Sequence, residues 1–399
     1  MEEIGCKMKI SARRKRILIF INRKLITYDH IIPFLFELKK YNPNAKLEIW
    51  FPDFSTYVEI KKNTFLYETG KNIADLYIIT NSHYKGFAKI FHNINISLKL
   101  VYRIVRAILF STTFIHYKLL DSRPFSILKY LNKNNTFLAE SDSFGFTQVM
   151  KNVDNLKKIP LDPNTKNTNF LQFSDCWVQK DDKRGDFLYF GIPKKRVVWI
   201  NYVLSVSERY IENQYKAYKI AHPSNVVAIM LGYFGYAIYR TNKNVQEKLL
   251  IETLEVLRDC KYYGIILLKP HIITDLKIVN KIIKLFPELK IFITYLHPMI
   301  LATQSKVVIA HNYSSTLNDF KIMGVKTIEY ASYNSQALEL MSGISMRPEY
   351  VDYFINHDKL LLYQTLKKLL KEKKKEDIQI DINDQNKNSI FDRMLNIRQ

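Results

Sequence analysis

Glycine is scarce in this sequence, with 11 residues among 399, about 3% where about 7% is usual. None of the eleven forms a G-x-G-x-x-G or a G-x-x-x-x-G-K-[ST] motif, so the common dinucleotide fingerprint and the P-loop are absent. The sequence also lacks D-x-D, H-E-x-x-H and G-x-S-x-G motifs. These absences argue against a metal-bridged diphosphate site, a zinc protease and an α/β-hydrolase.

Cysteine is equally rare. Cys6, Cys176 and Cys260 lie far apart in the sequence, and no C-x-x-C pair occurs. This spacing indicates neither a zinc cluster nor a disulfide framework, so no metal site is predicted. Unpaired cysteines are typical of a reducing compartment, and we therefore expect a cytoplasmic location.

Acidic residues are few as well: 38 Asp and Glu stand against 60 Lys and Arg, which gives a formal net charge of +22. Such a field favours a polyanionic partner, whether nucleic acid, an anionic membrane or an acidic substrate. A codon bias toward A and T would enrich lysine in the same way, so charge alone does not choose among these explanations. Because no RNA-binding motif or zinc finger is present, nucleic acid is not expected.

No apolar run is long and uncharged enough to predict a transmembrane segment. The longest, residues 98–114, carries Arg103 and Arg106, and each charge would cost roughly 2.5–3.5 kcal/mol at the centre of a spanning helix. Together with Lys99, they fall at i, i+4 and i+7, which predicts a basic stripe on a helix. The stripe leaves open contact with an anionic membrane surface; a core-packed helix with a solvated charged face is the alternative.

The chain is long enough for two domains, and 47% of its residues are hydrophobic, which is typical of globular proteins. In the first half, β-rich runs alternate with helical patterns, so the sequence predicts a parallel sheet covered by helices. Strands are predicted over residues 16–21, 46–51, 75–80, 136–139, 175–179 and 196–200, with a helix over 29–41 and a loop over 162–169.

The alternation resumes after Pro223 and predicts a second parallel sheet. Strands are predicted over 225–231, 264–269, 289–294, 306–310 and 326–330, and helices over 207–221, 245–260, 276–286, 297–303, 315–323 and 360–375. We therefore expect one α/β lobe over residues 1–205 and a second over 206–376. A polar linker with a C-terminal amphipathic helix is expected over 377–399.

The strongest local signal runs from residue 306 to residue 330 and is typical of a strand, a tight turn, a helix and a second strand. Ser314, Ser315 and Thr316 fall at the predicted start of the helix. Their hydroxyls and the unpaired N–H groups of the first helical turn can converge on an anion such as a phosphate. Ordinary helix capping by the same residues is the alternative.

Lys269, Pro270 and His271 follow the strand predicted over 264–269. In open α/β sheets, ligands bind at the carboxyl ends of the strands. An imidazole there can donate to a phosphate oxygen, and Lys269 can offset the charge of the phosphate. Because the Ser-Ser turn follows a strand of the same sheet, we expect both turns at one edge.

In the first lobe, Glu140 and Asp142 follow the strand predicted over 136–139, and Gly145 allows a tight turn after them. A carboxylate that is partly desolvated in a cleft has a raised pKa and can act as a general base. Either residue fits this role. A solvated surface acid without a catalytic role is the alternative.

These residues form an ordered set: the acidic turn with its glycine, a Gly-x-Pro-x-Lys element, the Lys-Pro-His turn and a Tyr-Ser-Ser-Thr turn that begins at Tyr313. The second element consists of Gly191, Pro193 and Lys195. The set resembles bacterial surface-carbohydrate transferases of the GT-B fold. Residues 307–330 are similar to part of the CDP-glycerol glycerophosphotransferases, whereas the motif order is similar to bacterial sialyltransferases and Kdo transferases.

Two departures from these families stand out. The usual His-Pro pair is reversed at Pro270-His271, with His297-Pro298 as a second candidate. His311-Asn312 stands where an acidic pair is more usual, and this departure bears most on the glycerophosphotransferase resemblance.

The resemblance implies a GT-B fold of two doubly wound parallel-sheet lobes facing across a cleft, an acceptor-side first lobe and a donor-binding second lobe. It implies an inverting, metal-independent glycosyltransferase of surface polysaccharide biosynthesis, without a cofactor. The donor would be a CMP-activated acidic sugar of the sialic acid or Kdo type. The acceptor would be a glycan or lipid-linked glycan, at the inner face of the membrane if the enzyme is peripheral.

The resemblance also assigns roles to residues. Asp142 or Glu140 would be the base, and His271 with Lys269 would stabilise the leaving phosphate. The expected donor-binding residues are Lys269, His271, Tyr313, Ser314, Ser315, Thr316 and Glu329, the last for the ribose. Three alternatives stay open: a CDP-polyol phosphotransferase, a non-hydrolysing nucleotide-sugar epimerase, and a non-enzymatic basic protein that binds RNA or membrane.

Overall fold

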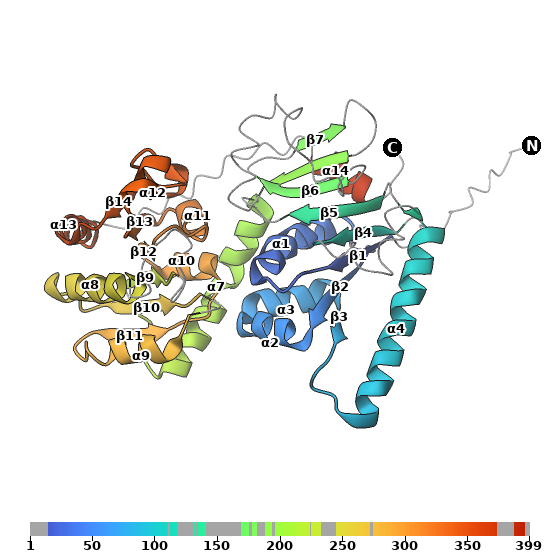
Figure 1. The fold of residues 1–399 in the computed structure, drawn as a ribbon, viewed down its shortest axis with the longest axis horizontal. Coiled ribbons are helices and arrows are strands. Elements are labelled where there is room, and N and C mark those ends of the chain that lie inside the picture. Colours follow the sequence, from blue (N-terminus) through green and yellow to red (C-terminus); the bar gives the residue numbers. More distant parts are fainter. Residues whose placement is uncertain are drawn as a thin grey trace, which may run out of the picture. The chain divides into compact units, whose positions relative to one another are not determined.

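The protein is described here by a computed structural model, which divides the chain into two compact units (Figure 1). The N-terminal unit comprises Met1–Arg196 and Ile382–Gln399, and the C-terminal unit comprises Val197–Asp381. The structure describes residues 15–110, 112–117, 131–132, 135–140, 169–174, 178–181, 188–193, 196–223, 225–232, 245–271, 274–372 and 387–395.

The N-terminal unit contains an eight-stranded sheet among its described residues, in the order β3-β2-β1-β4-β5-β6-β8-β7. Neighbouring strands pair in parallel, except that β7 runs antiparallel to β8. The strands are β1 (Arg16–Phe20), β2 (Lys46–Asp53), β3 (Asp75–Thr80), β4 (Thr113–His116), β5 (Thr136–Glu140), β6 (Asn169–Ser174), β7 (Val178–Asp181) and β8 (Leu188–Pro193).

The centre of this sheet is apolar on both faces. Four of the five residues of β1 are fully buried, as expected for a parallel strand covered by helices on both sides. The ring of Phe20 stacks between Trp50 of β2 and Phe114 of β4, with centroid distances of 5.5 and 4.7 Å. These ring contacts connect three adjacent strands and stabilise their pairing.

Helices of the N-terminal unit come from both ends of the chain. Among the described residues they are α1 (Leu25–Tyr41), α2 (Phe54–Lys62), α3 (Thr64–Ile73), α4 (Gly86–Leu109) and, from the C-terminus, α14 (Lys387–Met394). The ring of Phe391 in α14 packs on Phe34 and Tyr41 of α1. The Lys387 ammonium lies 3.0 Å from the buried Glu37 carboxylate of α1, so the end of the chain returns to the first unit.

The C-terminal unit has a six-stranded, all-parallel sheet in the order β11-β10-β9-β12-β13-β14. Its strands are β9 (Val226–Met230), β10 (Ile265–Lys269), β11 (Lys290–Ile293), β12 (Val307–His311), β13 (Lys326–Ala331) and β14 (Tyr353–Asn356). The chain places β10 and β11 on one side of β9, and then crosses to place β12, β13 and β14 on the other side.

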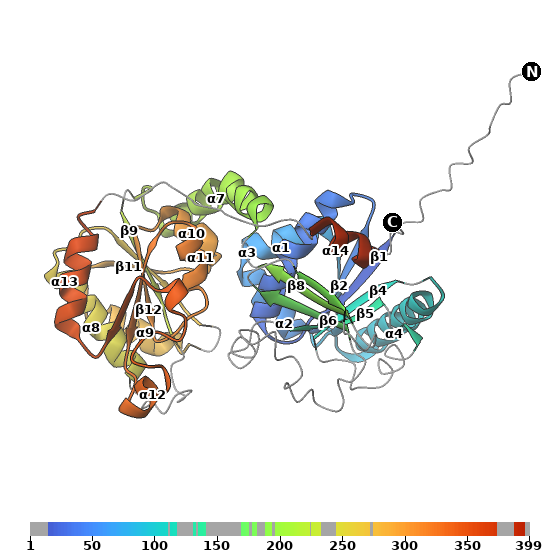
Figure 2. The ribbon, with the colours of Figure 1, turned by 90° about the horizontal axis from the view of Figure 1, so that it is seen from above.

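Helices cover both faces of this second sheet (Figure 2). One side carries α8 (Val245–Asp259) and α13 (Lys359–Leu369), together with α9 (Leu276–Ile283). The opposite side carries α10 (Pro298–Gln304) and α11 (Leu317–Ile322), with α7 (Val197–Tyr218) packed on α10. A short α12 (Ser335–Leu340) and a 3-10 turn (Pro348–Tyr350) follow β13.

The alternation of strands and helices predicted from the sequence is confirmed in both units. One predicted strand, over 196–200, is wrong. Arg196 precedes α7 and residues 197–200 begin it, because Trp199, Ile200, Val203 and Ser207 form a buried stripe at helical spacing. The strand predicted over 175–179 overlaps only the start of β7, and residues 175–177 lie outside the described ranges. Strands β4, β6, β8 and β14 were not predicted. Of the loop predicted over 162–169, Asn169 begins β6 and residues 162–168 lie outside the described ranges.

The unit boundaries differ in place from the expected ones. The division falls at 196/197, and the expected position 205 lies inside α7, which is continuous. Residues 382–399 belong to the N-terminal unit, and α14 packs there through its apolar side chains. Among the helices that the structure describes, none combines the length and apolar character needed to cross a membrane.

Candidate functional site

The carboxyl ends of β9 and β12 form the point at which the strand order of the second sheet reverses. These strands are neighbours in the sheet, with Met230 opposite Ala310, although β10 and β11 come between them in the sequence. Ligands of open α/β sheets bind at this kind of point, because the loops diverge there and leave a crevice. Gly232 follows β9 at this edge, and the turn Asn312–Thr316 follows β12.

The turn after β12 is held in shape by its first residue. Asn312 has a positive φ of 60°, a conformation that asparagine tolerates better than most residues. Its N–H donates to the Tyr330 carbonyl at 3.0 Å, and its side-chain oxygen accepts the Ser332 N–H at 3.0 Å. Asn312 therefore connects the turn both to β13 and to the residue that follows β13.

A buried hydrogen-bond chain supports the second residue of the turn. The Tyr313 N–H donates to the Tyr333 hydroxyl at 2.7 Å, and this hydroxyl donates to Glu329 Oε1 at 2.8 Å. The Ser345 hydroxyl donates to Glu329 Oε2 at 2.5 Å. Burial raises the pKa of the fully buried Glu329, while the bonds from Ser345 and Tyr333 act to lower it. Both carboxylate oxygens are thus engaged within the protein.

The rest of the turn offers hydrogen-bond donors. Among the described contacts, no acceptor takes the N–H groups of Ser314, Ser315 or Thr316, and the Ser314 and Thr316 hydroxyls lie 2.7 Å apart. All three residues are partly exposed. Helix α11 has only six residues, so its dipole is weak. Backbone N–H groups and hydroxyls of this kind can bind an anion.

Two buried acceptors without a donor among the described residues lie beside this turn. They are His311 Nδ1 and Gln246 Oε1, whose residues are 1% and 6% exposed. The Thr253 hydroxyl donates to the Leu249 carbonyl and lies 3.0 Å from His311 Nε2, so it accepts from an Nε2–H. Burial lowers the pKa of His311 to about 3, and the imidazole is neutral.

Gly232 lies against the Gln246 side chain and the His311 backbone. A Cβ atom at this position would lie 2.6 Å from Gln246 Oε1 and 2.7 Å from the His311 carbonyl oxygen. The close approach of β9, β12 and the start of α8 therefore requires glycine here.

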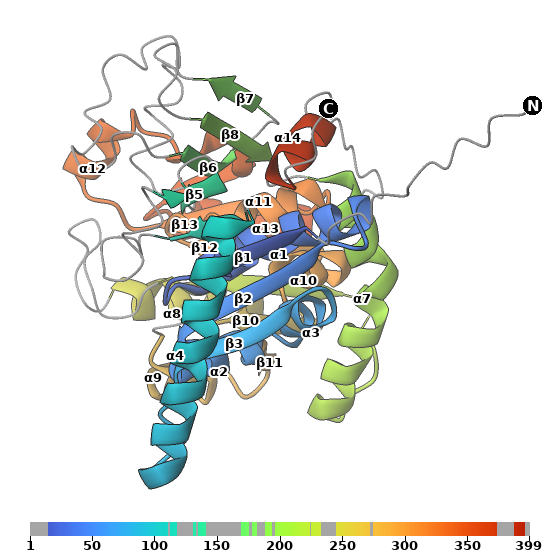
Figure 3. The same ribbon diagram turned by 90° about the vertical axis from the view of Figure 1, so that its right-hand side faces the viewer.

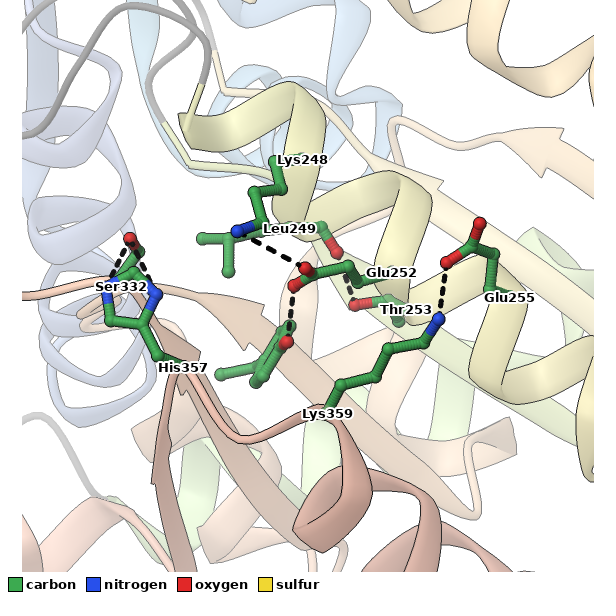
Figure 4. A network of polar contacts seen from close by, with 9 residues as sticks. Lys248, Leu249, Glu252, Thr253, Glu255, Ser332, His357 and Lys359 are labelled. Atoms are coloured by element: carbon green, nitrogen blue, oxygen red, sulfur yellow. Dashed lines mark hydrogen bonds and ion pairs between the residues drawn. The ribbon is translucent and has the colours of Figure 1, made fainter.

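Helix α8 is fixed beside this edge by a polar network (Figure 4). The Tyr330 hydroxyl of β13 donates to Glu252 at 2.5 Å, and the Lys248 ammonium lies 3.6 Å from the other Glu252 oxygen. At the start of α13, the Lys359 ammonium donates to Glu255 at 2.6 Å. The network joins α8 to β13 and α13.

The Lys-Pro-His turn lies at the same sheet edge as the Ser-Ser turn, as predicted. Lys269 ends β10, which pairs with β9, and its carbonyl accepts the Leu231 N–H at 3.0 Å. His271 is exposed, and partial desolvation by the surrounding chain lowers its pKa. The second candidate, His297, is 2% exposed, and its Nδ1 accepts the Met299 N–H at the start of α10. His297 therefore has a capping role.

The predicted base lies in the N-terminal unit. Glu140 is the last residue of β5, at a carboxyl end within that sheet, and its side chain is not described. Asp142 and Gly145 lie outside the described residues, as does Lys195. Gly191 and Pro193 belong to β8.

The basic stripe of α4 is not uniformly solvated. Arg103 Nε donates to the fully buried Glu48 at 2.9 Å. Arg106 donates to the Tyr102 hydroxyl at 3.1 Å, and the Lys99 ammonium lies 5.4 Å from the centre of the Tyr77 ring. The predicted stripe thus faces partly into the N-terminal unit, and Arg103 belongs to its interior.

Sequence reasoning missed four residues that shape the site: Tyr333, Ser345, Gln246 and Gly232. None stands in a recognised motif, and Ser345 is 16 residues from the carboxylate it contacts. Only Gly232 carried a signal, as a rare glycine directly after a strand. Among the described residues, no group of three or more His, Cys, Asp or Glu side chains is arranged to hold a metal ion.

Comparison with known proteins adds information at the level of the fold. No protein-family model matches the sequence, and no curated protein matches it. Among solved structures, UDP-N-acetylglucosamine 2-epimerase from Rickettsia bellii is similar over 96% of this chain and 97% of its own, with a TM-score of 0.52 and 11% identity. The chain has a GT-B fold. Its two parallel-sheet α/β units are the two lobes of that fold, as predicted.

Two further solved structures are similar to this chain with lower TM-scores. UDP-GlcNAc 2-epimerase from Neisseria meningitidis, bound to UDP-GlcNAc, covers 96% of this chain and 95% of its own, with 14% identity and a TM-score of 0.47. MurG from Acinetobacter baumannii covers 96% of this chain and 100% of its own, with 11% identity and a TM-score of 0.42.

Proposed function

We propose that this protein is a glycosyltransferase that binds a nucleotide-activated sugar at the carboxyl edge of the second sheet. The observation that carries the proposal is the turn Ser314–Thr316 at the strand-order reversal: its three N–H groups have no acceptor among the described residues, and its three residues carry hydroxyls. A phosphate group of the donor supplies the oxygens that these groups require.

The proposed roles follow from the positions. Ser314, Ser315 and Thr316 bind the donor phosphate, while Lys269 and His271 stabilise the charge that develops on it as the leaving group departs. Both oxygens of Glu329 are engaged by Tyr333 and Ser345. We therefore assign to Glu329 and Tyr333 a positioning role for the Tyr313 backbone, in place of a contact between Glu329 and ribose.

In the proposed reaction, the acceptor hydroxyl oxygen attacks the anomeric carbon of the sugar, and the bond from that carbon to the phosphate oxygen breaks. The hydroxyl proton passes to a carboxylate, for which Asp142 and Glu140 are the candidates. The leaving nucleotide keeps the bonding electrons as phosphate charge. Inversion at the anomeric carbon follows from this single displacement.

For the donor we propose a CMP-linked acidic sugar, and for the acceptor a glycan or lipid-linked glycan at the inner face of the membrane. This finer assignment is supported by the sequence resemblance to sialyltransferases and Kdo transferases. The net charge of +22 suits an acidic donor and an acidic growing polymer.

A second candidate is a non-hydrolysing nucleotide-sugar epimerase, favoured by the fold likeness to the epimerase from Rickettsia bellii. Such an enzyme would use the same phosphate-binding turn but change its substrate without an acceptor. A CDP-polyol phosphotransferase, favoured by the resemblance of residues 307–330, would instead form a phosphodiester product.

The first experiment is a thermal-shift panel of CMP, CDP, UMP, UDP and GDP, with and without EDTA. At a hundredfold excess over Kd, a ligand adds about 2.7 kcal/mol to the folded state, which raises Tm by several degrees. We expect a CMP-selective shift that EDTA does not change, and its loss in Ser314→Ala/Ser315→Ala and in His271→Ala. The control is Ser205→Ala, whose hydroxyl bonds the Tyr202 carbonyl within α7.

Product analysis then separates the candidates. Acceptor-dependent release of CMP with formation of a glycoside supports the proposal, and Asp142→Asn or Glu140→Gln should lower turnover by orders of magnitude while nucleotide binding stays intact. Conversion of a nucleotide sugar without acceptor would identify an epimerase. A UDP-selective shift would contradict the CMP assignment, and no shift with any nucleotide would contradict the transferase.

A further inference from the structure

Helix α4 carries two apolar faces, and only one of them is covered. Figures 1 and 3 show α4 on the outside of the N-terminal unit, with its first turns extending past β3. Ile96, Ile104 and Ala107 are buried against Leu18, Phe20, Trp50 and Phe114. The buried side chains begin at Ile96, and residues 86–95 have none.

The uncovered face is a continuous ridge of large apolar side chains. Phe87, Phe91, Leu98 and Leu109 are 82%, 71%, 66% and 68% exposed. We define the α4 ridge as Phe87, Ile90, Phe91, Ile94, Leu98, Val101, Val105 and Leu109, all of them exposed. Successive members are mostly three or four residues apart, so they lie on one side of the helix, over a length of about 33 Å.

An exposed apolar surface of this extent marks an interaction site, because monomeric proteins rarely leave one open to water. Individual exposed apolar residues occur elsewhere in the chain, but here eight of them form one line. The ridge begins in the first turns of α4, where no side chain is buried.

The charges around the ridge have one sign. The sequence from residue 76 to residue 120 contains no Asp or Glu, whereas Lys85, Lys89, Lys99, Arg103 and Arg106 fall within it. Lys85, which caps the start of α4, is exposed. Lys89 and Lys99 are exposed too, and 3.6 residues per turn place them on the sides of α4 outside the ridge. Arg103 is paired with Glu48, so the lysines and Arg106 form a basic surface on the sides of α4 outside the ridge.

We propose that the α4 ridge inserts into the surface of an anionic lipid bilayer, with α4 lying in the plane of the membrane. An interfacial helix of this kind presents Phe and Leu to the acyl chains and Lys or Arg to the headgroups. The lysines lie on the sides of the helix outside the ridge, and their long side chains can extend toward the headgroups. Each lysine near an anionic surface adds about 1 kcal/mol of attraction.

A second copy of the chain is the less suitable occupant. Pairing two α4 helices would bring two sets of basic side chains together, and the segment has no carboxylate to neutralise them. The basic side chains of α4 are complementary to anionic lipid, and they would repel the same side chains of a second copy. The proposal concerns the N-terminal unit alone and does not depend on the proposed function.

The test is co-sedimentation of the full chain with vesicles at about 0.15 M salt. One set of vesicles contains phosphatidylcholine and phosphatidylglycerol at about 3:1, and the other contains phosphatidylcholine only. We expect wild type to bind the anionic vesicles, and Phe87→Ser/Phe91→Ser/Leu98→Ser to bind at least about a hundredfold more weakly. Lys85→Glu/Lys89→Glu should weaken binding at least about tenfold.

A matched control removes equally exposed apolar side chains from the other unit. Tyr263, Leu285 and Leu360 are 83%, 63% and 66% exposed, and Tyr263→Ser/Leu285→Ser/Leu360→Ser should bind vesicles like wild type. The Phe91→Trp variant tests insertion directly, through the fluorescence of the introduced tryptophan in a protein that still binds. Its emission should shift to the blue on vesicles and be quenched by brominated lipid.

Three results would overturn the proposal. The first is wild-type protein that stays in the supernatant with both kinds of vesicle. The second is a ridge variant that sediments as wild type does, or an emission of the Phe91→Trp variant that vesicles leave unchanged. The third is a wild-type dimer that the ridge variant converts to a monomer while neither binds lipid, which would assign the ridge to a second copy.

Discussion

The two units share a parallel α/β plan but place their polar groups differently. The N-terminal unit holds charges in its interior: Glu48 lies between Arg16 and Arg103, and Glu37 lies between Arg196 and Lys387. The interior of the C-terminal unit is an apolar cluster along β9, β10, β12 and β13.

In the C-terminal unit, the buried polar groups of β12, β13 and α8 gather at the carboxyl edge of the sheet. His311, Glu329 and Gln246 are all buried there. In the first unit, buried ion pairs connect helices and strands to one another. In the second unit, the buried polar side chains lie at the turn that follows β12. Among the described residues of the second unit, the turn Ser314–Thr316 keeps N–H groups that can donate to a ligand.

The largest effect is expected from the charge cluster of the N-terminal unit. Glu48→Gln leaves the guanidinium groups of Arg16 and Arg103, which are 9% and 16% exposed, without a counter-charge. Breaking a buried ion pair in this way costs about 3–5 kcal/mol. The measurement is unfolding in urea, monitored by hydrogen exchange in peptides from β1 and β2. These peptides should show the loss of stability.

The control for that cluster is the exposed pair of the other unit. Lys359→Ala breaks a contact with Glu255 in which both side chains are partly solvated, and the free energy of unfolding should change by less than about 1 kcal/mol. Equal losses of unfolding free energy in the two variants would show that the buried ion pairs of the first unit contribute no more than an exposed pair.

A pH-dependent effect is expected from His311 in the C-terminal unit. Burial lowers its pKa to about 3, whereas the unfolded chain takes up the proton near pH 6.5. Its contribution to stability is therefore complete above about pH 6.5 and is lost as the pH falls toward 3, with about 3 kcal/mol missing at pH 4. His311→Gln should lack this slope when unfolding is measured from pH 7 to pH 4.

His222→Gln is the matched control for His311, because His222 is exposed. Its variant should keep the wild-type slope. A wild-type slope in His311→Gln would mean that other groups produce the acid sensitivity of this unit.

The smallest effect is expected where the second unit supports its turn. Tyr333→Phe removes the hydroxyl that joins the Tyr313 N–H to Glu329, and leaving those groups unpaired costs about 1–3 kcal/mol. Because the turn then loses its support, nucleotide affinity should fall by about tenfold, measured by calorimetry. Tyr363→Phe, which alters an exposed hydroxyl beside Lys367, should change neither quantity. Unchanged affinity in Tyr333→Phe would limit its role to folding.

Local sequence determined most of the elements. Apolar runs such as residues 226–230 and 307–311 bury every side chain, and a strand covered on both faces needs such a run. The misassigned residues 196–200 show the limit of this approach. Val197 and Val198 favour a strand by propensity, but the buried stripe that continues to Tyr215 favours a helix, and tertiary packing decided between them.

The sequence by itself also determined the two-lobed α/β plan and the position of the Ser-Ser and Lys-Pro-His turns at one sheet edge, because parallel strands all end on the same side. Only the tertiary structure decided what surrounds those turns. Tyr333, Ser345 and Gln246 are brought to the site by separate elements, and α4 turns Arg103 inward and an apolar ridge outward. Such contacts depend on the way helices pack against a sheet, and a linear pattern does not record which face each helix presents.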